Sequence, residues 1–272
     1  MDILSKIVAH KKQEVTARKA VVSKSMLEQG IYFERSTLSM KEFLLRPDKS
    51  GIIAEFKRQS PSKGIINGTA TVEAVTTAYV QAGVSGLSVL TDEHFFGGHS
   101  NDLRAARKVN DCPILRKDFI IDEYQLLEAK SIGADVILLI AECLDKQQLK
   151  QLARTAKKLD LEVLVEVHTL AQLDKLNEHV DIVGVNNRNL KDFTVSIQNS
   201  IDLFPSIPAE FIKISESGIN DPKSVIQLQE AGFQGFLIGE CFMKTANPGL
   251  ACTNFIEAIQ PTKKSVEQND SI

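Results

Sequence analysis

Side chains that can transfer protons or bind anions recur in this sequence directly after short apolar runs. The run Pro113–Leu115 leads straight into Arg116, Lys117 and Asp118. Other runs of the same kind end in Glu55, Lys57, Glu166, Asn186, Arg188 and Glu216. A lysine and a carboxylate held together can serve as general acid and general base, because burial and neighbouring charges shift their pKa values. The pattern indicates acid–base chemistry, provided that the fold brings the ends of these runs together.

Two later segments have the composition of a phosphate site. The segment "SESG" contains Ser217 and Gly218, and the segment "IGE" contains Gly239 and Glu240. Each offers backbone N–H groups close to the start of an expected helix, where anions bind. The segment "SPS" adds the hydroxyl of Ser60 as a further donor. A single glycine most often serves a turn, so the prediction of a phosphate site depends on these segments lying together.

Other classes of site find no support in the sequence. The five histidines lack a metal-ligand spacing such as HxxxH and are interpreted as structural or solvated: His10, His94, His99, His168 and His179. The four cysteines form no CxxC pair, which indicates reduced, buried thiols and neither a disulfide framework nor a zinc site. No GxSxG motif or paired Cys–His arrangement is present, so covalent acyl chemistry is not expected.

The apolar runs themselves predict eight strands. They span residues 51–56, 86–90, 113–117, 135–140, 162–167, 181–186, 211–216 and 235–239. The runs are nearly continuous in apolar residues and do not alternate with polar ones. Continuous runs are typical of strands that are covered on both faces, as in a parallel sheet.

Helical patterns lie between the strands, at 71–83, 122–134, 145–160 and 221–232. Their capping residues include Asp122 and Asp221 at the start and Gly133 and Gly232 at the end. Strand–helix units in this number predict a (β/α)8 barrel, in which the carboxyl ends of all strands meet at the rim that holds the active site. A doubly wound sheet is the alternative, but the first strand is followed by "KRQSPSKG" and not by GxGxxG.

The chain is expected to form a single domain of 272 residues with three parts. Residues 1–50 form an N-terminal helical extension, residues 51–259 form the barrel, and residues 260–272 form a polar tail. Within the extension, residues 3–8 carry an apolar helical stripe and residues 39–45 predict a second helix. A packing role for the extension and a role as a substrate lid both remain open.

Composition restricts the partners and the location. The net charge is −3 and hydrophobic residues make up 43%, which is typical of a globular protein and gives no reason to expect nucleic acid or membrane as a partner. No apolar run approaches the length of a membrane helix, and the first residues lack the apolar core of a signal peptide. We expect a cytoplasmic monomer that acts on a small molecule.

The motifs in their order along the chain resemble the indole-3-glycerol phosphate synthase family. The most specific are "AEFKRQSPS" and "LRKDF", and they are joined by "LVEVH", "GVNNRNL", "ISESGI" and "FLIGECFM". The resemblance covers about residues 1–258. It implies the monofunctional enzyme of tryptophan biosynthesis, a carboxy-lyase. That enzyme closes the ring of 1-(2-carboxyphenylamino)-1-deoxyribulose 5-phosphate with loss of carbon dioxide and water.

The resemblance also implies roles for single residues. Lys117 is similar to the general acid that protonates the substrate carbonyl, and Glu166 is similar to the base or the partner of the developing cation. Lys57 resembles the lysine that meets the anthranilate carboxylate. The rest of the implied catalytic set is Glu55, Asn186 and Glu216. The implied substrate-binding residues are Arg188, Ser217, Phe96, Phe119 and Leu190.

The implied phosphate-binding residues are Ser60, Gly218, Gly239 and Glu240. Glu240 departs from the family, in which many members have a small residue at this position, and we expect its carboxylate to turn toward a cation or solvent. No metal or organic cofactor is expected, because the aromatic amine of the substrate supplies the electrons. Two competing interpretations are a phosphoribosylanthranilate isomerase, which is expected to use a Cys–Asp pair, and an inactive barrel that binds a phosphosugar for regulation.

Overall fold

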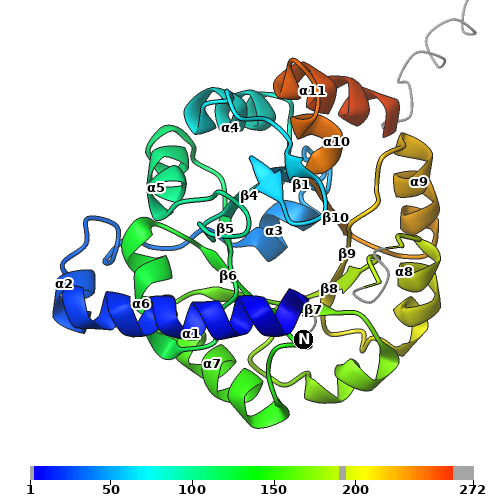
Figure 1. The fold of residues 1–272 in the computed structure, drawn as a ribbon. Coiled ribbons are helices and arrows are strands. Elements are labelled where there is room, and N and C mark those ends of the chain that lie inside the picture. The colour runs from blue at the N-terminus through cyan, green and yellow to red at the C-terminus, as the bar shows by residue number, and fades with distance from the viewer. Residues whose placement is uncertain (1–2, 190–193, 260–272) are drawn as a thin grey trace, which may run out of the picture.

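Eight parallel strands close into a barrel in the computed structural model of the chain, which describes residues 3–189 and 194–259. Around the barrel the strands follow the order β1-β10-β9-β8-β7-β6-β5-β4, as Figure 1 shows. Their bounds are β1 Ile52–Phe56, β4 Gly86–Leu90, β5 Ile114–Lys117, β6 Val136–Ile140, β7 Glu162–Val167, β8 Ile182–Asn186, β9 Ile212–Glu216 and β10 Gly235–Ile238. Each lies within a predicted strand, so the prediction of a (β/α)8 barrel is confirmed.

Successive side chains along each strand point alternately into and out of the barrel, which divides the core into two layers. Ile53 belongs to the cluster inside the barrel, together with residues such as Leu115 and Leu164. Ile52 and Phe56 instead pack between the strands and the outer helices. Because both faces are covered, β1 and β6 are buried at every position, which explains their continuous apolar sequences.

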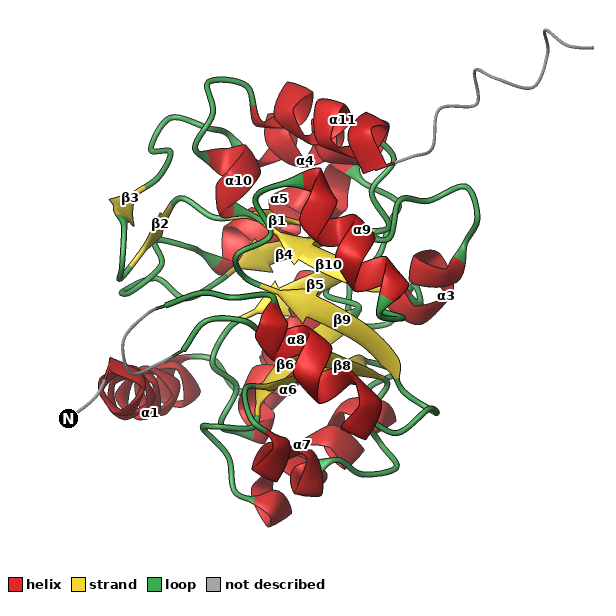
Figure 2. Ribbon diagram, turned by 90° about the vertical axis from the view of Figure 1, so that its right-hand side faces the viewer, coloured by secondary structure: helices red, strands yellow, loops and turns green. Residues whose placement is uncertain are grey.

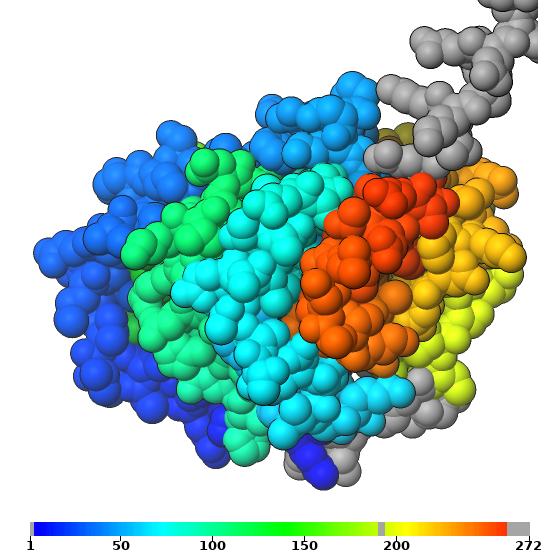
Figure 3. Space-filling view, turned by 90° about the horizontal axis from the view of Figure 1, so that it is seen from above, coloured from blue at the N-terminus to red at the C-terminus, as the bar shows by residue number. Residues whose placement is uncertain are grey.

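The predicted helices are confirmed as α4 Val72–Gln81, α6 Glu123–Ile132, α7 Lys146–Lys158 and α9 Pro222–Glu230. Asp122 and Asp145 each form a capping box, and Asp221 accepts a hydrogen bond from the backbone of Lys223. The helix expected after the last strand is α10 Glu240–Met243. Helical elements that were not predicted are α2 Lys24–Glu28, α5 Ser100–Val109, α8 Gln198–Leu203, α11 Pro248–Ile259 and the 3₁₀ turns η1 Leu170–Lys175 and η2 Phe204–Ser206. Figure 3 shows α4 in cyan and α11 in orange lying side by side on the outside of the barrel.

The N-terminal extension covers both ends of the barrel. It contains α1 Ile3–Val21, α2 Lys24–Glu28 and α3 Met40–Leu45. Met40 and Leu44 of α3 join the inner cluster at the amino ends of the strands, which closes that end. In Figure 2, α3 lies at one end of the barrel, and α1 lies at the other.

A small hairpin follows β1 at the same end as α1 (Figure 2). Its strands are β2 Gln59–Ser60 and β3 Gly64–Ile65, paired antiparallel. The hairpin was not predicted, because strands of two residues are too short to show an apolar pattern. The hairpin brings Ser60 and Lys63 to the rim that the barrel strands reach with their carboxyl ends.

Candidate active site

One pocket of about 390 Å³ opens at the carboxyl ends of the strands. Every predicted site residue in the described part of the chain lines it: Glu55, Lys57, Ser60, Phe96, Lys117, Phe119, Glu166, Asn186, Arg188, Glu216, Ser217, Gly218, Gly239 and Glu240. Leu190 lies outside the described residues. Residues as far apart in sequence as Glu55 and Glu240 therefore meet in one cavity, as the barrel predicts.

Lys117 lies between two carboxylates at the centre of the pocket. Its Nζ is 2.6 Å from Oε2 of Glu216 and 3.2 Å from Oε2 of Glu166. Asn186 donates a hydrogen bond of 3.0 Å from Nδ2 to Oε1 of Glu166. Glu166 is 5% exposed and Glu216 is 1% exposed, so these charges interact with little screening by water. The arrangement places a proton donor next to two proton acceptors.

The carboxylates hold Lys117 in its charged form. Burial alone would lower the pKa of Lys117, but attraction by Glu216, Glu166 and Glu55 outweighs burial and raises the pKa above that of an ordinary lysine. The effect of the carboxylates therefore dominates, and Lys117 carries a proton at neutral pH.

The pKa values of Glu166 and Glu216 are shifted in opposite directions. Burial and the nearby charge of Glu166 raise the pKa of Glu216, although Lys117 acts against this shift. For Glu166, burial favours the neutral form, but Lys117, His168 and Asn186 together hold its pKa below the ordinary value. Glu166 is therefore the ionised member of the pair near neutral pH.

A second lysine–carboxylate pair lies on β1 and just after it. Nζ of Lys57 is 2.6 Å from Oε1 of Glu55, so both side chains point the same way, as the strand alternation predicted. Gly239 makes room for this pair, because a Cβ at that position would lie 2.7 Å from Oε1 of Glu55. Gly184 makes room for Glu216 in the same way.

Another part of the pocket wall is apolar. The rings of Phe96 and Phe119 pack against each other, with centroids 5.9 Å apart and planes tilted by 36°. Ile3, Leu4 and Ile7 of α1 line the pocket as well. This side offers a slot for a flat apolar group next to Lys117.

The loop after β9 has an unusual backbone on the predicted phosphate side of the pocket. Ser217 and Gly218 both have a positive φ, of 70° and 74°. A positive φ is uncommon for serine, and backbone strain of this kind clusters at functional sites. The hydroxyl of Ser60 is buried and has no hydrogen-bond partner among the described residues, which leaves it available to a ligand.

Glu240 begins α10, at the edge of the pocket. Its Oε1 lies 3.9 Å from Nζ of Lys63 on the hairpin. The carboxylate thus faces a cation, as expected, and an acid in the first helical turn is favoured by the helix dipole.

His168 is a pocket residue that the sequence interpretation missed. Its Nε2 lies 3.5 Å from Oε1 of Glu166, and neither ring nitrogen has a hydrogen-bond partner within the described ranges. The spacing in "EVH" was the available signal, since it puts His168 and Glu166 on the same face of one strand. The other lining residues that were not predicted include Lys63, Asp118 and Val195.

The described residues lack two other kinds of feature. They contain no group of three or more His, Cys, Asp or Glu side chains placed to hold a metal ion. None of their helices has both the length and the apolar character that crossing a membrane requires.

Comparison with solved structures supports the fold. The chain is similar to 3-hexulose-6-phosphate synthase from Salmonella typhimurium, with a TM-score of 0.61 and 14% identity over 77% of this chain and 98% of that one. A second structure of 3-hexulose-6-phosphate synthase gives a TM-score of 0.63 at 13% identity, over 77% of this chain and all of that one. At such low identity the likeness shows the barrel and nothing about the reaction.

Comparison of the sequence is more specific. The indole-3-glycerol phosphate synthase family model matches residues 4–255. The indole-3-glycerol phosphate synthase of Bacteroides thetaiotaomicron is 51% identical over 95% of this chain and 99% of its own length. That of Laribacter hongkongensis is 44% identical over 92% of this chain and 97% of its own. With a family model matched over almost the whole chain and relatives aligned over their full length, the chain belongs to the indole-3-glycerol phosphate synthase family.

Proposed function

We propose that this protein is an indole-3-glycerol phosphate synthase of tryptophan biosynthesis, acting as a monomer in the cytoplasm. It converts 1-(2-carboxyphenylamino)-1-deoxyribulose 5-phosphate into indole-3-glycerol phosphate, carbon dioxide and water. The observation that carries the proposal is the position of Lys117 between Glu166 and Glu216 in a pocket that also has an apolar slot and a loop with an unusual backbone on the predicted phosphate side.

Lys117 is the general acid of ring closure. The aromatic carbon that bears the carboxylate attacks the substrate carbonyl carbon, and Lys117 gives its proton to the carbonyl oxygen. The raised pKa of Lys117 supports this role, because the side chain is charged when substrate arrives. Once a proton has left Lys117, Glu216, which holds the proton of the carboxylate pair, lies within reach to restore it.

Glu166 acts on the cation that ring closure produces. The carboxylate stabilises the positive charge on the substrate nitrogen until carbon dioxide leaves and the ring regains its electrons. In the last step the new hydroxyl takes a proton from Lys57 and leaves as water, and Glu166 accepts the proton lost from the carbon beside the nitrogen. Asn186 keeps Glu166 oriented through the 3.0 Å hydrogen bond.

The two ends of the substrate bind on different sides of the pocket. The aryl ring lies in the slot formed by Phe96 and Phe119, with its carboxylate toward Lys57. The phosphate lies against the backbone of Ser217 and Gly218 and the hydroxyl of Ser60. Holding both ends aligns the reacting carbon with the carbonyl, which is a large part of the catalysis of a ring closure.

The activity can be tested by mixing the purified protein with the carboxyphenylamino substrate and following the fluorescence of the indole product. The chain contains no tryptophan, so the product signal is free of indole emission from the protein. We expect turnover with release of one carbon dioxide per indole formed. Binding of substrate without turnover would instead support the inactive regulatory barrel.

A further inference from the structure

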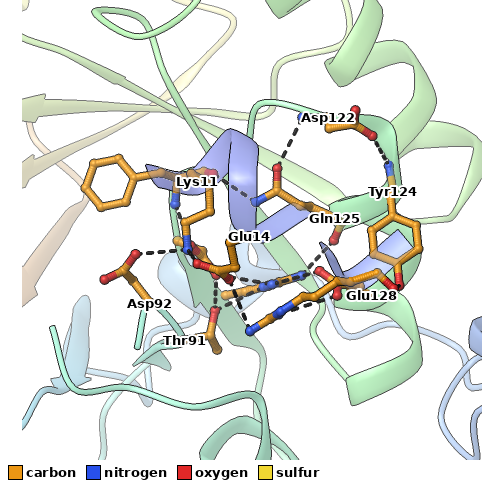
Figure 4. Close-up of polar contacts among 12 residues, drawn as sticks. Lys11, Glu14, Thr91, Asp92, Asp122, Tyr124, Gln125 and Glu128 are labelled. Atoms are coloured by element: carbon orange, nitrogen blue, oxygen red, sulfur yellow. Dashed lines mark hydrogen bonds and ion pairs between the residues drawn. The ribbon is translucent and has the colours of Figure 1, made fainter. Parts of the chain in front are cut away.

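Lys11 occupies the centre of a buried charge cluster beneath α1, outside the pocket itself. Its Nζ lies 2.9 Å from each of three carboxylate oxygens, on Glu14, Asp92 and Asp118. Lys11 and Asp92 are both 0% exposed. Figure 4 shows Lys11 directed away from its helix toward Asp92, with Glu14 beside it. The proposed reaction uses none of these contacts directly.

One of these carboxylates belongs to the residue after the general acid. Asp118 directly follows Lys117, and its Oδ1 pairs with Lys11. Its Oδ2 accepts hydrogen bonds from Oγ1 of Thr91 at 2.6 Å and from Nη2 of Arg116 at 3.1 Å. The turn that carries Lys117 is therefore fixed from the N-terminal extension on one side and from the barrel on the other.

The other barrel carboxylate organises the aromatic slot. Asp92 follows β4, and its Oδ1 accepts the backbone N–H of Phe96 at 3.2 Å while its Oδ2 pairs with Lys11. Across the slot, the backbone N–H of Phe119 donates to Asp118 at 2.8 Å. Lys11 thus holds together the two turns from which the facing rings of the slot project.

The charges of the cluster depend on Lys11. Burial alone would lower the pKa of Lys11, but attraction by Asp118, Asp92 and Glu14 outweighs it and the net pKa lies above the ordinary value. Burial would likewise raise the pKa of Asp118, whereas Arg116 and Lys11 hold it well below its usual range. Without Lys11, two buried carboxylates on neighbouring turns would lose the cation that they share.

Further along α1, more contacts fix the helix to the barrel. Arg18 pairs with Glu93 at 3.0 Å and with Glu128 at 3.4 Å. The hydroxyl of Tyr124 donates to the carbonyl oxygen of Val22 at 2.9 Å. Figure 4 shows Tyr124 and Glu128 on the same side of α1. Arg18 also reaches the turn after β4 through Glu93, whereas Lys11 pairs with a carboxylate on each of the two turns, Asp92 and Asp118.

We propose that Lys11 is a positioning residue, which sets the placement of Lys117 through Asp118 and the width of the aryl slot through Asp92. The inference rests on the proposed function. It assigns to the N-terminal extension a direct part in catalysis that differs from that of a lid, because a helix tied down by buried ion pairs serves as a fixed support.

The test compares Lys11→Met with Arg35→Met. Arg35 also belongs to the extension and also pairs with a fully buried aspartate, Asp135, but at the amino ends of the strands. Both changes remove a cation from a fully buried aspartate, although Asp135 keeps Arg107 as a partner. Turnover is measured per folded protein, with the folded fraction determined by near-ultraviolet circular dichroism well below both melting temperatures.

Lys11→Met is expected to lower kcat/KM at least tenfold. Misplacement of Lys117 should reduce kcat, and a distorted aryl slot should raise KM. Arg35→Met is expected to stay within about twofold of the unaltered protein. Equal effects of the two changes would overturn the inference and leave the proposed function standing. Inactivity of the unaltered protein would reject the proposed function and the inference together.

A double variant covers the case in which Lys11→Met does not fold. Lys11→Met combined with Asp92→Asn removes one anion together with the cation, so the remaining Asp118 keeps Arg116 as its partner. We expect this variant to fold and still to lose at least tenfold in kcat/KM. Activity equal to that of the unaltered protein would overturn the positioning role.

Discussion

Glu166 and Glu216 share one lysine, and their different surroundings separate their pKa values. Glu166 has further partners in Asn186 and His168, whereas Oε1 of Glu216 is buried and has no hydrogen-bond partner in the part of the chain that the structure describes. Two close carboxylates of this kind rarely ionise together, because their charges repel. The pair can therefore hold one proton, and Glu216 is the member that holds it.

The raised pKa of Glu216 makes stability depend on pH. In the folded protein Glu216 keeps its proton up to about pH 7, whereas the ordinary carboxyl of the unfolded chain loses it near pH 4.5. The folded state thus binds more protons in this window, and the contribution of Glu216 to stability falls as pH rises from 4.5 to 7. Glu216→Gln removes this dependence, and the variant should gain about 1–3 kcal/mol relative to the unaltered protein over that window.

The measurement is the difference in free energy of unfolding between Glu216→Gln and the unaltered protein at pH 4.5 and at pH 7. Only the change of this difference with pH is diagnostic, since glutamine also alters the contact with Lys117. Asp202→Asn, at an exposed position on α8, serves as the control. A difference that stays constant with pH would contradict the raised pKa.

Glu166→Gln should reduce kcat strongly and change KM little. The amide keeps the size of the side chain and can still contact Lys117, but it cannot accept a proton at neutral pH. A loss of about 10²–10⁴-fold is expected for removal of a general base. Steady-state kinetics separate the two parameters, and a rise in KM alone would make Glu166 a binding residue.

Glu240→Ser should change the affinity for the phosphorylated substrate by less than about tenfold, or ~1.4 kcal/mol. The carboxylate faces Lys63 across 3.9 Å, and only the backbone of residue 240 is expected at the phosphate. Calorimetric titration with the substrate analogue that lacks the reactive carbonyl measures this directly. A hundredfold gain in affinity would mean that the carboxylate repels the phosphate.

Residue types could be read from the sequence, but their pKa values could not. Lys117 was identified from the motif "LRKDF", and its two carboxylate partners were each found at another strand end. Which of those carboxylates lies closer, and how deeply each is buried, depends on distances that no spacing along the chain encodes. His168 is a different case, because the spacing in "EVH" did place it on the same side as Glu166, and that pattern was not used.

At the scale of elements, α1 contributes an apolar wall to the pocket. Leu4 lines the pocket and is half-buried, whereas Val8 lies on the same helix with similar burial but does not line the pocket. Leu4→Ala should therefore raise KM several-fold with little change in kcat or in melting temperature. Val8→Ala is the matched control and should leave KM unchanged. Equal values of KM in the two variants would show that α1 only packs on the barrel.

The strands were predictable, and several connecting elements were not. Continuous apolar runs define a strand that is buried on both faces, so all eight were found. Helix α5 was missed because its apolar stripe is short, with Leu103 and Ala106 as its buried apolar residues. The β2–β3 hairpin has two residues per strand, and its position at the rim follows from the end of β1 and not from any pattern of its own.

At the scale of the whole molecule, the closed barrel is what turns separate strand ends into one site. Charged residues after apolar runs predicted the rim, because parallel strands deliver their carboxyl ends to the same face. The contacts from Lys11 to Asp92 and Asp118 could not be predicted from the strand ends in this way. They join a helix of the extension to loops far along the chain, so only the packed molecule reveals them.

The barrel should also tolerate loss of its central lysine. Lys117 lies at the end of β5, and the packing of β5 depends on Ile114 and Leu115, which are both fully buried. Without Lys117, the buried carboxylates nearby can take up a proton and so avoid an unpaired charge. Lys117→Ala should therefore fold.

Turnover by Lys117→Ala tests the central claim most directly. Indole formation is followed by fluorescence under saturating substrate, alongside the unaltered protein and with circular dichroism to confirm the fold. We predict a folded variant whose kcat is lower by about 10²–10⁴-fold, the usual contribution of a positioned acid. A folded variant with kcat within fivefold of the unaltered protein would contradict the assignment of Lys117 as the general acid.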